Sequence, residues 1–352
     1  MVDIDQARAE AFEEFLTVEK KSGNNVMRLT ERAGQRIEVI PTGVWTLDVA
    51  LGVGGVPRGR IVELYGPESS GKTGLALKLA GQTQKLLGLP VGFVDAEHAL
   101  DPEYAEMMGV NLDALAMYQP DTGEGGLNMA RRMTASGAFG LVIIDSTAAL
   151  VPQKELEGET GDQHVGLQAR MITQALRPLA GEAARSNTTV IFINQLRMQI
   201  GQMFGNPETT PGGKGLKFYA SLRLDVRSPP SKKNWIDQNK GIAESQGTTV
   251  KVAKNKVAPP QRKADYILDF THGIDEAATV LDAAKACGLV EVKGASITNV
   301  LTGEKIIGKD NFRQVLADDP VKMAAWRVNL ETMLFDPPSA TEDVDDLEVA
   351  AV

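Results

Sequence analysis

Five short apolar runs, most of them separated by segments of helical period, constrain the fold of this chain more than any other feature. The runs have the length of strands and cover residues 61–65, 91–96, 114–118, 141–145 and 189–194. Continuous apolar strands that alternate with helices are typical of a mainly parallel sheet buried on both faces. The pattern therefore predicts an α/β core, and the ligands of such cores bind at the carboxyl ends of the strands.

Composition bounds the size and setting of this core. At 352 residues, 43% of them hydrophobic, the chain can form a large core domain with smaller flanking pieces. The single cysteine, Cys287, excludes an internal disulfide, and no leader pattern precedes the core, which together favour the cytoplasm. No run approaches the roughly 18 apolar residues of a membrane span, so we expect no membrane partner.

The net charge of −9 is unevenly distributed and does not exclude a nucleic-acid partner. The last 17 residues contain six acids and no base, and the rest of the chain carries only −3. Such a tail either solubilises the chain as a disordered end or acts as a decoy for a basic surface elsewhere.

Smaller segments flank the predicted core. Residues 5–20 place Phe12, Phe15 and Leu16 on one face at helical spacing, which indicates an amphipathic helix. This helix packs either on its own domain or on a neighbouring subunit. Residues 228–248 are polar and rich in turn formers, which favours a surface excursion. We expect the chain to divide into an N-terminal helix and strand, the core, a small C-terminal domain and the acidic tail, at residues 1–35, 36–270, 271–335 and 336–352.

A glycine-rich motif follows the first apolar run directly. GPESSGKTG matches GxxxxGK[ST] in the strand-to-helix context that this motif requires. Its backbone N–H groups can wrap phosphates, Lys72 can reach the outer phosphates, and Thr73 offers a hydroxyl to Mg²⁺. The predicted phosphate-binding loop comprises Gly66, Pro67, Glu68, Ser69, Ser70, Gly71, Lys72, Thr73 and Gly74.

Two acidic groups at strand ends extend this site. Asp145 follows four apolar residues and can hold the water shell of Mg²⁺. An Asp in this place is more often a helix cap, but the neighbouring phosphate loop favours the metal role. Asp95, Glu97 and His98 follow another strand. We choose Glu97 to orient the attacking water, because a carboxylate adds no positive charge near the γ-phosphate, and keep His98 as its rival.

With these motifs the chain resembles the bacterial RecA recombinases from about residue 26 to residue 260. The resemblance weakens over 261–335 and returns in the acidic tail. It is carried by GPESSGKT, FVDAEHALDPEYA, QPDTGE, IIDSTAALVP, ELEGETGDQHVGLQARM, FINQLRM, MFGNPETTPGGKGLKFYASLRLDVR and KVAKNKVAPP.

The resemblance implies a RecA-like P-loop NTPase core, and an activity that uses ATP and Mg²⁺. Members of this family polymerise as a helical filament on single-stranded DNA, exchange strands with double-stranded DNA in repair, and hydrolyse ATP between adjacent subunits when DNA is bound. A repressor of the SOS type is a further partner that the divergent residues 228–248 and the C-terminal domain leave open. The alternatives are a P-loop enzyme acting on a small molecule, such as a kinase, and a regulator that binds ATP and DNA but hydrolyses little.

Two DNA-binding loops follow from the same resemblance. The first, at 157–165, precedes a helix on which Arg170, Thr173 and Arg177 share one face at positions i, i+3 and i+7. The second covers 196–213. There, glycines would let backbone N–H groups approach phosphates and an apolar side chain would wedge between bases. Its candidate DNA-binding residues are Arg197, Ile200, Gly212, Gly213 and the adjoining Lys214.

The resemblance also assigns residues to the nucleotide and the subunit interface. Asp101 and Tyr104 match positions beside the adenine, where a carboxylate can accept the exocyclic amine and a ring can stack. Phe218 matches an interface residue. The groups expected to act in hydrolysis are Lys72, the water-orienting Glu97, the γ-phosphate sensor Gln195, and Lys254 and Lys256, which would reach the neighbouring subunit's γ-phosphate as an arginine finger does.

Three positions depart from the family pattern. Gly74 stands where a second Thr is common, Gln199 replaces a common Lys, and Lys214 stands where Asn is usual. The positive charge of the second loop is therefore moved rather than lost.

Overall fold

The computed structural model describes residues 4–24, 26–28, 30, 36–158, 166–198, 208–228, 235–237 and 242–335. The chain forms two compact units, Met1–Ile37 and Glu38–Val352. In the first, helix α1 (Ile4–Lys21) ends in two lysines, whose charges complement the helix macrodipole. Arg28 lies over the ring of Phe12 and pairs with Glu13.

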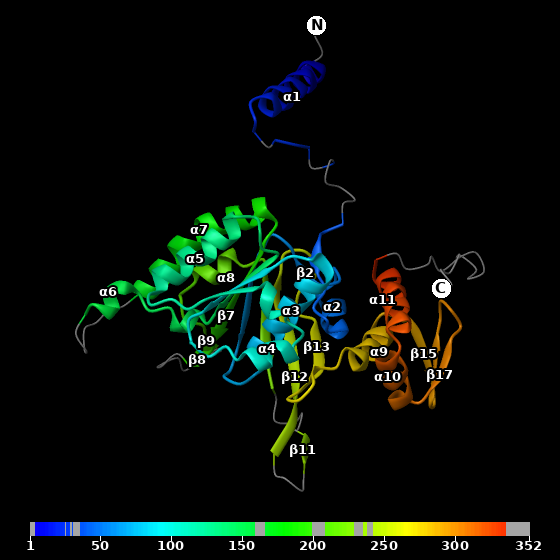
Figure 1. The fold of residues 1–352 in the computed structure, drawn as a ribbon. Helices are drawn as coiled ribbons and strands as arrows, with labels where there is room; N and C mark the ends of the chain where they lie inside the picture. The colour runs from blue at the N-terminus through cyan, green and yellow to red at the C-terminus, as the bar shows by residue number, and fades with distance from the viewer. Residues whose placement is uncertain are drawn as a thin grey trace. The chain divides into compact units, whose positions relative to one another are not determined.

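The second unit is built on a sheet of ten strands among the described residues (Figure 1). The strand order is β14-β13-β12-β10-β3-β7-β6-β4-β5, and β11 pairs with β12. The parallel strands are β10 (Leu222–Arg227), β3 (Ile61–Gly66), β7 (Thr189–Gln195), β6 (Leu141–Asp145), β4 (Val91–Asp95) and β5 (Leu115–Tyr118). The antiparallel strands are β11 (Trp235–Asp237), β12 (Ile242–Asn255), β13 (Lys263–Asp269) and β14 (Gly273–Ile274). All five apolar runs of the sequence are parallel strands, which confirms the predicted fold class.

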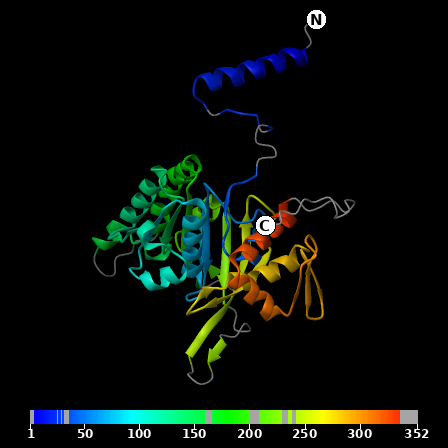
Figure 2. The same ribbon diagram turned by 45° about the vertical axis from the view of Figure 1, so that its right-hand side comes forward.

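Helices cover both faces of this sheet (Figures 1 and 2). Alternate residues of β3 serve the two faces: Val62 packs in one core with Leu75 of α3, and Ile61 packs in a second core with Leu176 of α7. The larger helices are α2 (Trp45–Leu51), α3 (Lys72–Leu87), α5 (Gly123–Ala135) and α7 (Leu167–Ser186). The shorter elements are α4 (Pro102–Met107), α6 (Gln153–Leu156), α8 (Gly215–Tyr219), the 3₁₀ turns Leu112–Ala114 and Thr147–Ala149, and the paired strands β1 (Val39–Ile40) with β2 (Val56–Pro57) and β8 (Arg197–Met198) with β9 (Glu208–Thr209).

A small domain with its own core follows the sheet. It combines α9 (Glu276–Ala286), a three-stranded antiparallel sheet of β15 (Val290–Lys293), β16 (Ser296–Asn299) and β17 (Lys305–Ile307), α10 (Lys309–Asp318) and α11 (Pro320–Phe335). Phe312 and Trp326 meet edge to face at its centre, with ring centroids 4.9 Å apart. Trp45 of α2 also joins this core.

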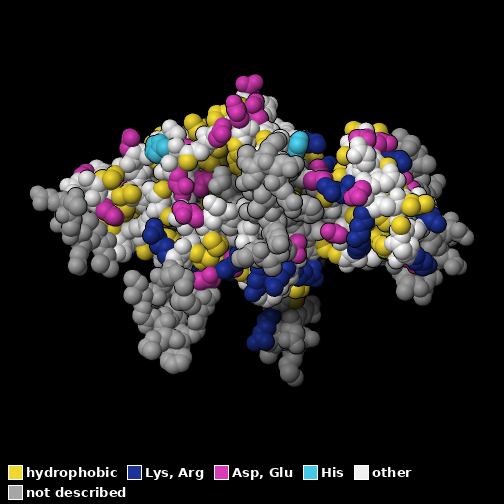
Figure 3. Space-filling model, turned by 90° about the horizontal axis from the view of Figure 1, so that it is seen from below, with side chains coloured by type: hydrophobic (Ala, Val, Ile, Leu, Met, Phe, Trp, Pro, Cys, Tyr) yellow, Lys and Arg dark blue, Asp and Glu magenta, His cyan; other side chains and the backbone are white. Residues whose placement is uncertain are grey.

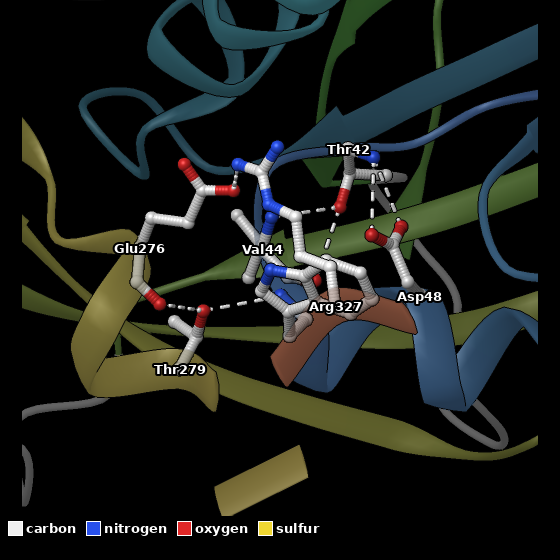
Figure 4. A network of polar contacts seen from close by, with 7 residues as sticks. Thr42, Val44, Asp48, Glu276, Thr279 and Arg327 are labelled. Atoms are coloured by element: carbon white, nitrogen blue, oxygen red, sulfur yellow. Dashed lines mark hydrogen bonds and ion pairs between the residues drawn. The ribbon is translucent and has the colours of Figure 1, made fainter. Parts of the chain in front are cut away.

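A polar network, which we call the joint network, connects α2 to the small domain (Figure 4). The backbone N–H of Thr42 donates to Asp48 Oδ1 at 2.9 Å, and burial raises the pKa of Asp48 well above its usual value. The N–H of Trp45 donates to Thr279 Oγ1 at 3.1 Å. Arg327 pairs with Glu276 and lies 5.9 Å from the centre of the Trp45 ring.

The segment 228–248 differs from its predicted loop character. Strand β12 begins at Ile242, and Ser245, Gln246 and Thr248 are buried within it. The sequence did not predict this strand, because its buried residues are polar and the segment lacks the alternation of apolar and polar side chains that is typical of a strand. Residues 229–234 and 238–241 lie outside the described part of the chain.

None of the helices that the structure describes is both long and apolar enough to cross a membrane.

Candidate nucleotide and DNA site

The glycine-rich loop lies between β3 and α3, at the carboxyl end of the sheet. Ser69 and Gly71 have positive φ angles of 54° and 90°. A Cβ at Gly66 would lie 2.0 Å from the carbonyl oxygen of Val226, so only glycine fits there. Ser70 is buried, and its Oγ has no hydrogen-bond partner among the described residues. A loop with an unpaired buried hydroxyl beside a helix N-terminus fits a bound phosphate.

Lys72 begins helix α3 and turns back onto this loop. Its Nζ donates to the carbonyl oxygen of Pro67 at 2.5 Å. Burial lowers the pKa of Lys72, and the nearby carboxylates of Asp145, Glu97 and Glu68 oppose this shift. The ammonium group is therefore held within the loop that it is expected to serve.

Thr73 and Asp145 meet at the metal position expected from the sequence. The Thr73 hydroxyl donates to Asp145 Oδ2 at 2.7 Å. Burial raises the pKa of Asp145 to about 6, the bond from Thr73 opposes this shift, and the Glu97 carboxylate adds to it. A hydroxyl and a carboxylate oxygen in contact are suitable donors for Mg²⁺ together with phosphate and water oxygens.

Glu97 receives two hydrogen bonds on one oxygen. Ser146 Oγ and Gln195 Nε2 both donate to Glu97 Oε1, the latter at 3.1 Å. The structure thus brings the residue expected to orient water into contact with the residue expected to sense the γ-phosphate. Ser146 was not predicted: it follows Asp145, the last residue of β6, within the IIDSTAALVP motif, but no role was assigned to it.

A second carboxylate braces the loop that carries Glu97. Asp95 accepts hydrogen bonds from the backbone N–H groups of Ala99 and Leu100, each at 3.2 Å, and from Gln119 Nε2 at 3.0 Å. Its oxygens are therefore used in holding the loop. Gln119 begins the QPDTGE motif, so the sequence contained a signal for it but no role. His98 is exposed with a positive φ of 55°.

The residues expected beside the adenine lie on and next to α4. Asp101 caps this helix, since its Oδ1 accepts the N–H of Glu103 at 2.9 Å. Tyr104 is partly buried against α3, and burial raises its pKa. A Cβ at Gly74 would lie 2.5 Å from the Tyr104 hydroxyl. In this structure the tyrosine hydroxyl therefore occupies the space that a side chain at position 74 would fill.

The DNA-binding candidates on α7 lie on one face of the helix. Arg170, Thr173 and Arg177 are exposed, whereas Ile172 and Leu176 are buried. The predicted helical spacing therefore corresponds to a single solvent-facing row.

The end of the second loop packs beside this row. Gly212 and Gly213 have φ angles of 83° and 73°, and Cβ atoms there would lie 2.8 Å from Ile172 Cδ1 and 2.9 Å from Ala169 Cβ. Glycine at these positions thus also serves close packing on α7. Lys214 follows and is exposed.

The two ends of the second loop are fixed to the core. Strands β8 and β9 pair, and Arg227 Nη1 donates to Glu208 Oε1 at 2.8 Å. Asn194 Nδ2 donates to the carbonyl oxygen of Pro211 at 3.2 Å. Arg197 is exposed on β8. Ile200 and Gln199 lie outside the described residues, as do 159–165 of the first loop and the acidic tail.

The interface candidates form a separate group around α8. Phe218 is 71% exposed, more than any other large hydrophobic side chain that the structure records as exposed. Lys254 Nζ donates to the carbonyl oxygens of Lys217 and Phe218 at 2.7 and 3.1 Å, and thus caps α8. Burial lowers the pKa of Lys254, and the charge of Lys256 adds to this shift. Lys256 is exposed just beyond β12.

Charged side chains are unevenly spread over the surface. Figure 3 views the molecule from below and shows a group of Lys and Arg side chains below the centre of the view, whereas Asp and Glu side chains lie at its upper border and elsewhere across the face. The overall charge of −9 is thus no guide to the surface that a polyanion would meet.

Comparison with known proteins identifies the family of this chain. The RecA N-terminal domain family matches residues 10–275. The chain is 53% identical over 308 residues to Protein RecA of Syntrophus aciditrophicus, covering 86% of this chain and 87% of that protein. It is 51% identical over 305 residues to Protein RecA of Caldanaerobacter subterraneus subsp. tengcongensis, covering 86% of each chain.

The fold is also similar to that of a solved recombinase. The crystal structure of the RadB recombinase matches with a TM-score of 0.50 and 24% sequence identity, over 67% of this chain and 98% of that chain. At this identity the match supports the fold alone. The match to the family model and the identity to the RecA proteins show that the chain belongs to the RecA family, the DNA-dependent ATPases that act as recombinases in homologous recombination and repair.

Proposed function

We propose that the site binds ATP with Mg²⁺ and hydrolyses it in a filament on single-stranded DNA. The observation that carries this proposal is the bond between Gln195 and Glu97, 3.1 Å long. It joins the group that would orient the attacking water to the last residue of β7, directly before the second DNA-binding loop. A change in that loop can therefore reach the hydrolytic group through a single side chain.

The residues of the phosphate loop fit the nucleotide. Backbone N–H groups of 68–71 and the unpaired Ser70 hydroxyl would bind phosphate oxygens, with Lys72 beside them. Thr73 and Asp145 would hold Mg²⁺, which would neutralise charge on the phosphates. On the base side, Asp101 keeps a second carboxylate oxygen for the amine of adenine, and Tyr104 supplies the ring.

The α7 row and the adjoining loop end would follow the DNA backbone. Arg170, Arg177 and Lys214 are exposed cations, and Gly212 and Gly213 keep the loop close to the helix that carries two of them. Binding by such groups is dominated by phosphate contacts and falls as salt is raised. The pairing of single-stranded with double-stranded DNA, the cytoplasmic setting and a repressor of the SOS type as a filament ligand belong to the same proposal, on the family resemblance alone.

Assembly would complete the site. Lys254 and Lys256 lie near the exposed Phe218 of α8. This end of β12 is far from the chain's own phosphate loop. We therefore assign the two lysines to the nucleotide of a neighbouring subunit. Lys254 is already held by two carbonyl oxygens, which positions its ammonium group at that surface. Hydrolysis would then depend on the filament, and hence on DNA.

ATP hydrolysis by the purified chain, with and without single-stranded DNA, tests this proposal. We expect strong stimulation by DNA, lost in Lys72→Ala and in Lys254→Ala. The Lys254→Ala variant should still bind nucleotide, because the lysine serves the neighbouring site. Equal turnover with and without DNA would contradict the proposal and favour a small-molecule P-loop enzyme. DNA and ATP binding without turnover would favour a regulatory protein.

A further inference from the structure

We propose that Gln246 is a positioning residue of the phosphate-binding loop, acting through the conformation of Ser69. The proposal rests on the nucleotide site described above and adds to it a residue of β12, which is separated from β3 by β10 in the sheet. It also gives β12 a role at both of its ends, at the chain's own phosphate loop and at the lysines assigned to the neighbouring subunit.

The contact between the two residues is direct. Gln246 Nε2 donates to the carbonyl oxygen of Ser69 at 3.0 Å, and Gln246 is only 8% exposed. A side-chain amide buried in this way has a fixed orientation, because its hydrogen-bonding groups must be satisfied locally. The bond therefore fixes the carbonyl of Ser69 in space.

Ser69 needs such support. Its φ angle of 54° lies in the left-handed region, which a residue with a Cβ rarely adopts. Backbone conformations of this kind persist at functional sites when their surroundings hold them in place. The loop on either side cannot supply this restraint alone, since Gly71 is itself a flexible residue with a positive φ of 90°.

Residues of strands β12 and β13 also pack against the phosphate-binding loop. Thr248 lies two residues after Gln246, on the same face of β12, and is fully buried. A Cβ at Gly71 would lie 3.6 Å from Thr248 Oγ1 and 4.0 Å from the hydroxyl of Tyr266. The loop therefore rests on the strand that also bonds to Ser69.

The same strand carries Lys254 at its other end. Eight residues of strand separate Gln246 from Lys254, which corresponds to about 26 Å. Between them β12 is paired with β10 on one side and with β13 on the other. A register shift opposite Arg223 and Leu224 turns Lys254 toward α8 instead of the α3 face. Strand β12 thus bonds to the phosphate loop of its own chain and carries a lysine that we assign to the phosphate loop of the neighbouring subunit.

The first test removes the amide. Gln246→Ala and Gln246→Met both eliminate the donor, and Met preserves the length of the side chain in its buried place. We expect each variant to bind ATP about fivefold more weakly in the absence of DNA, with the same melting temperature within about 2 °C and with DNA-stimulated turnover at saturating ATP within about twofold of the parent. Direct titration with a fluorescent ATP analogue measures the affinity.

A matched control lies on the same hairpin. Gln261 Nε2 donates to the carbonyl oxygen of Ala253 at 3.2 Å, far from the phosphate loop. Gln261→Ala removes a bond of the same chemical type at an exposed position and should leave the affinity for ATP unchanged. An equal loss in both variants would overturn the proposal, because the effect would then come from the strand in general.

A double-mutant cycle tests the route through Ser69. Ser69→Gly lets the loop adopt its φ angle without support, so Gln246→Met should cost less than about twofold in affinity in that background. The same fivefold loss in both backgrounds would overturn the proposal, as would unchanged affinity in Gln246→Met alone. Equal hydrolysis with and without DNA would refute the proposed function. It would not affect the test of Gln246, because the affinity for ATP is measured without DNA and without turnover.

Discussion

The phosphate loop and the joint network both bury charged groups, but they differ in how those charges are balanced. In the joint network Arg327 pairs with Glu276, and burial lowers the pKa of Lys78 on α3 while the Glu276 carboxylate opposes this shift. At the phosphate loop the carboxylates of Asp145, Glu97 and Glu68 all act on one lysine, Lys72.

This difference separates a structural charge cluster from a functional one. Burial shifts the pKa of Asp48 in the joint network as it does that of Asp145, so a shifted pKa alone does not identify a site. A surplus of carboxylates next to an unpaired hydroxyl leaves room for a cation and for phosphate oxygens. A balanced cluster leaves no such room and instead holds two parts of the fold together.

The largest expected effect comes from removing one carboxylate of the surplus. Asp145→Asn should lower DNA-stimulated ATP hydrolysis by at least about 100-fold, because the metal position loses a charged donor. Its melting temperature in a chelator should not fall, since burial already disfavours the ionised carboxylate. Parallel measurement of turnover and melting checks both. A large loss of stability would mean that the surplus is structural, as in the joint network.

Breaking the pair in the joint network should have the opposite pattern. Arg327→Ala leaves Glu276 partly buried without its cation and should lower the free energy of unfolding by about 2 kcal/mol. ATP hydrolysis per folded molecule should stay within about twofold. Arg313→Ala, which breaks an ion pair with Asp275 at 47% and 38% exposure, is the matched control and should cost at most about 1 kcal/mol. If Arg327→Ala lost turnover but kept the stability of the parent, the joint network would be functional and not structural.

A smaller effect is expected from the pH dependence of Asp48. Its pKa is raised on folding, so the folded state keeps a proton that the unfolded state releases as pH rises above about 4. The stability contributed by this group is therefore complete below that pH and is lost as pH rises. The melting temperature of Asp48→Asn, compared with that of the parent at the same pH, should be higher at about pH 7.5 than at about pH 4.5. An equal difference at both values would show that Asp48 is not protonated preferentially in the fold.

The smallest effect concerns the close approach of Gly74 to Tyr104. Gly74→Ala places a methyl group against the tyrosine hydroxyl and should weaken ATP binding about threefold by displacing the ring. Tyr104→Phe removes the hydroxyl, and Gly74→Ala should cost less in that background. Titration of the parent, the two single variants and the double variant measures the coupling. Equal costs with and without the hydroxyl would place the tyrosine ring elsewhere when ATP is bound.

The sequence predicted those parts of the site that depend on local spacing. The phosphate loop and Asp145 follow from a motif and from strand ends, and the single face of α7 follows from helical periodicity. The contacts of Glu97 with Gln195 and of Gln246 with Ser69 join residues far apart in the chain, so only the order of the strands brings them together. Polar residues inside β12 gave no strand signal, because their burial depends on partners from other strands.

The fixed ends of the second loop have a consequence for how this chain can vary. Since the pairing of β8 with β9 and the bond from Arg227 to Glu208 already hold the ends together, the packing of the core does not depend on the length of the chain between them. Doubling the length of a closed loop costs only about 0.6 kcal/mol. Insertions between 198 and 208 should therefore cost the core little stability, so that selection on this length acts through DNA binding and its coupling to Gln195.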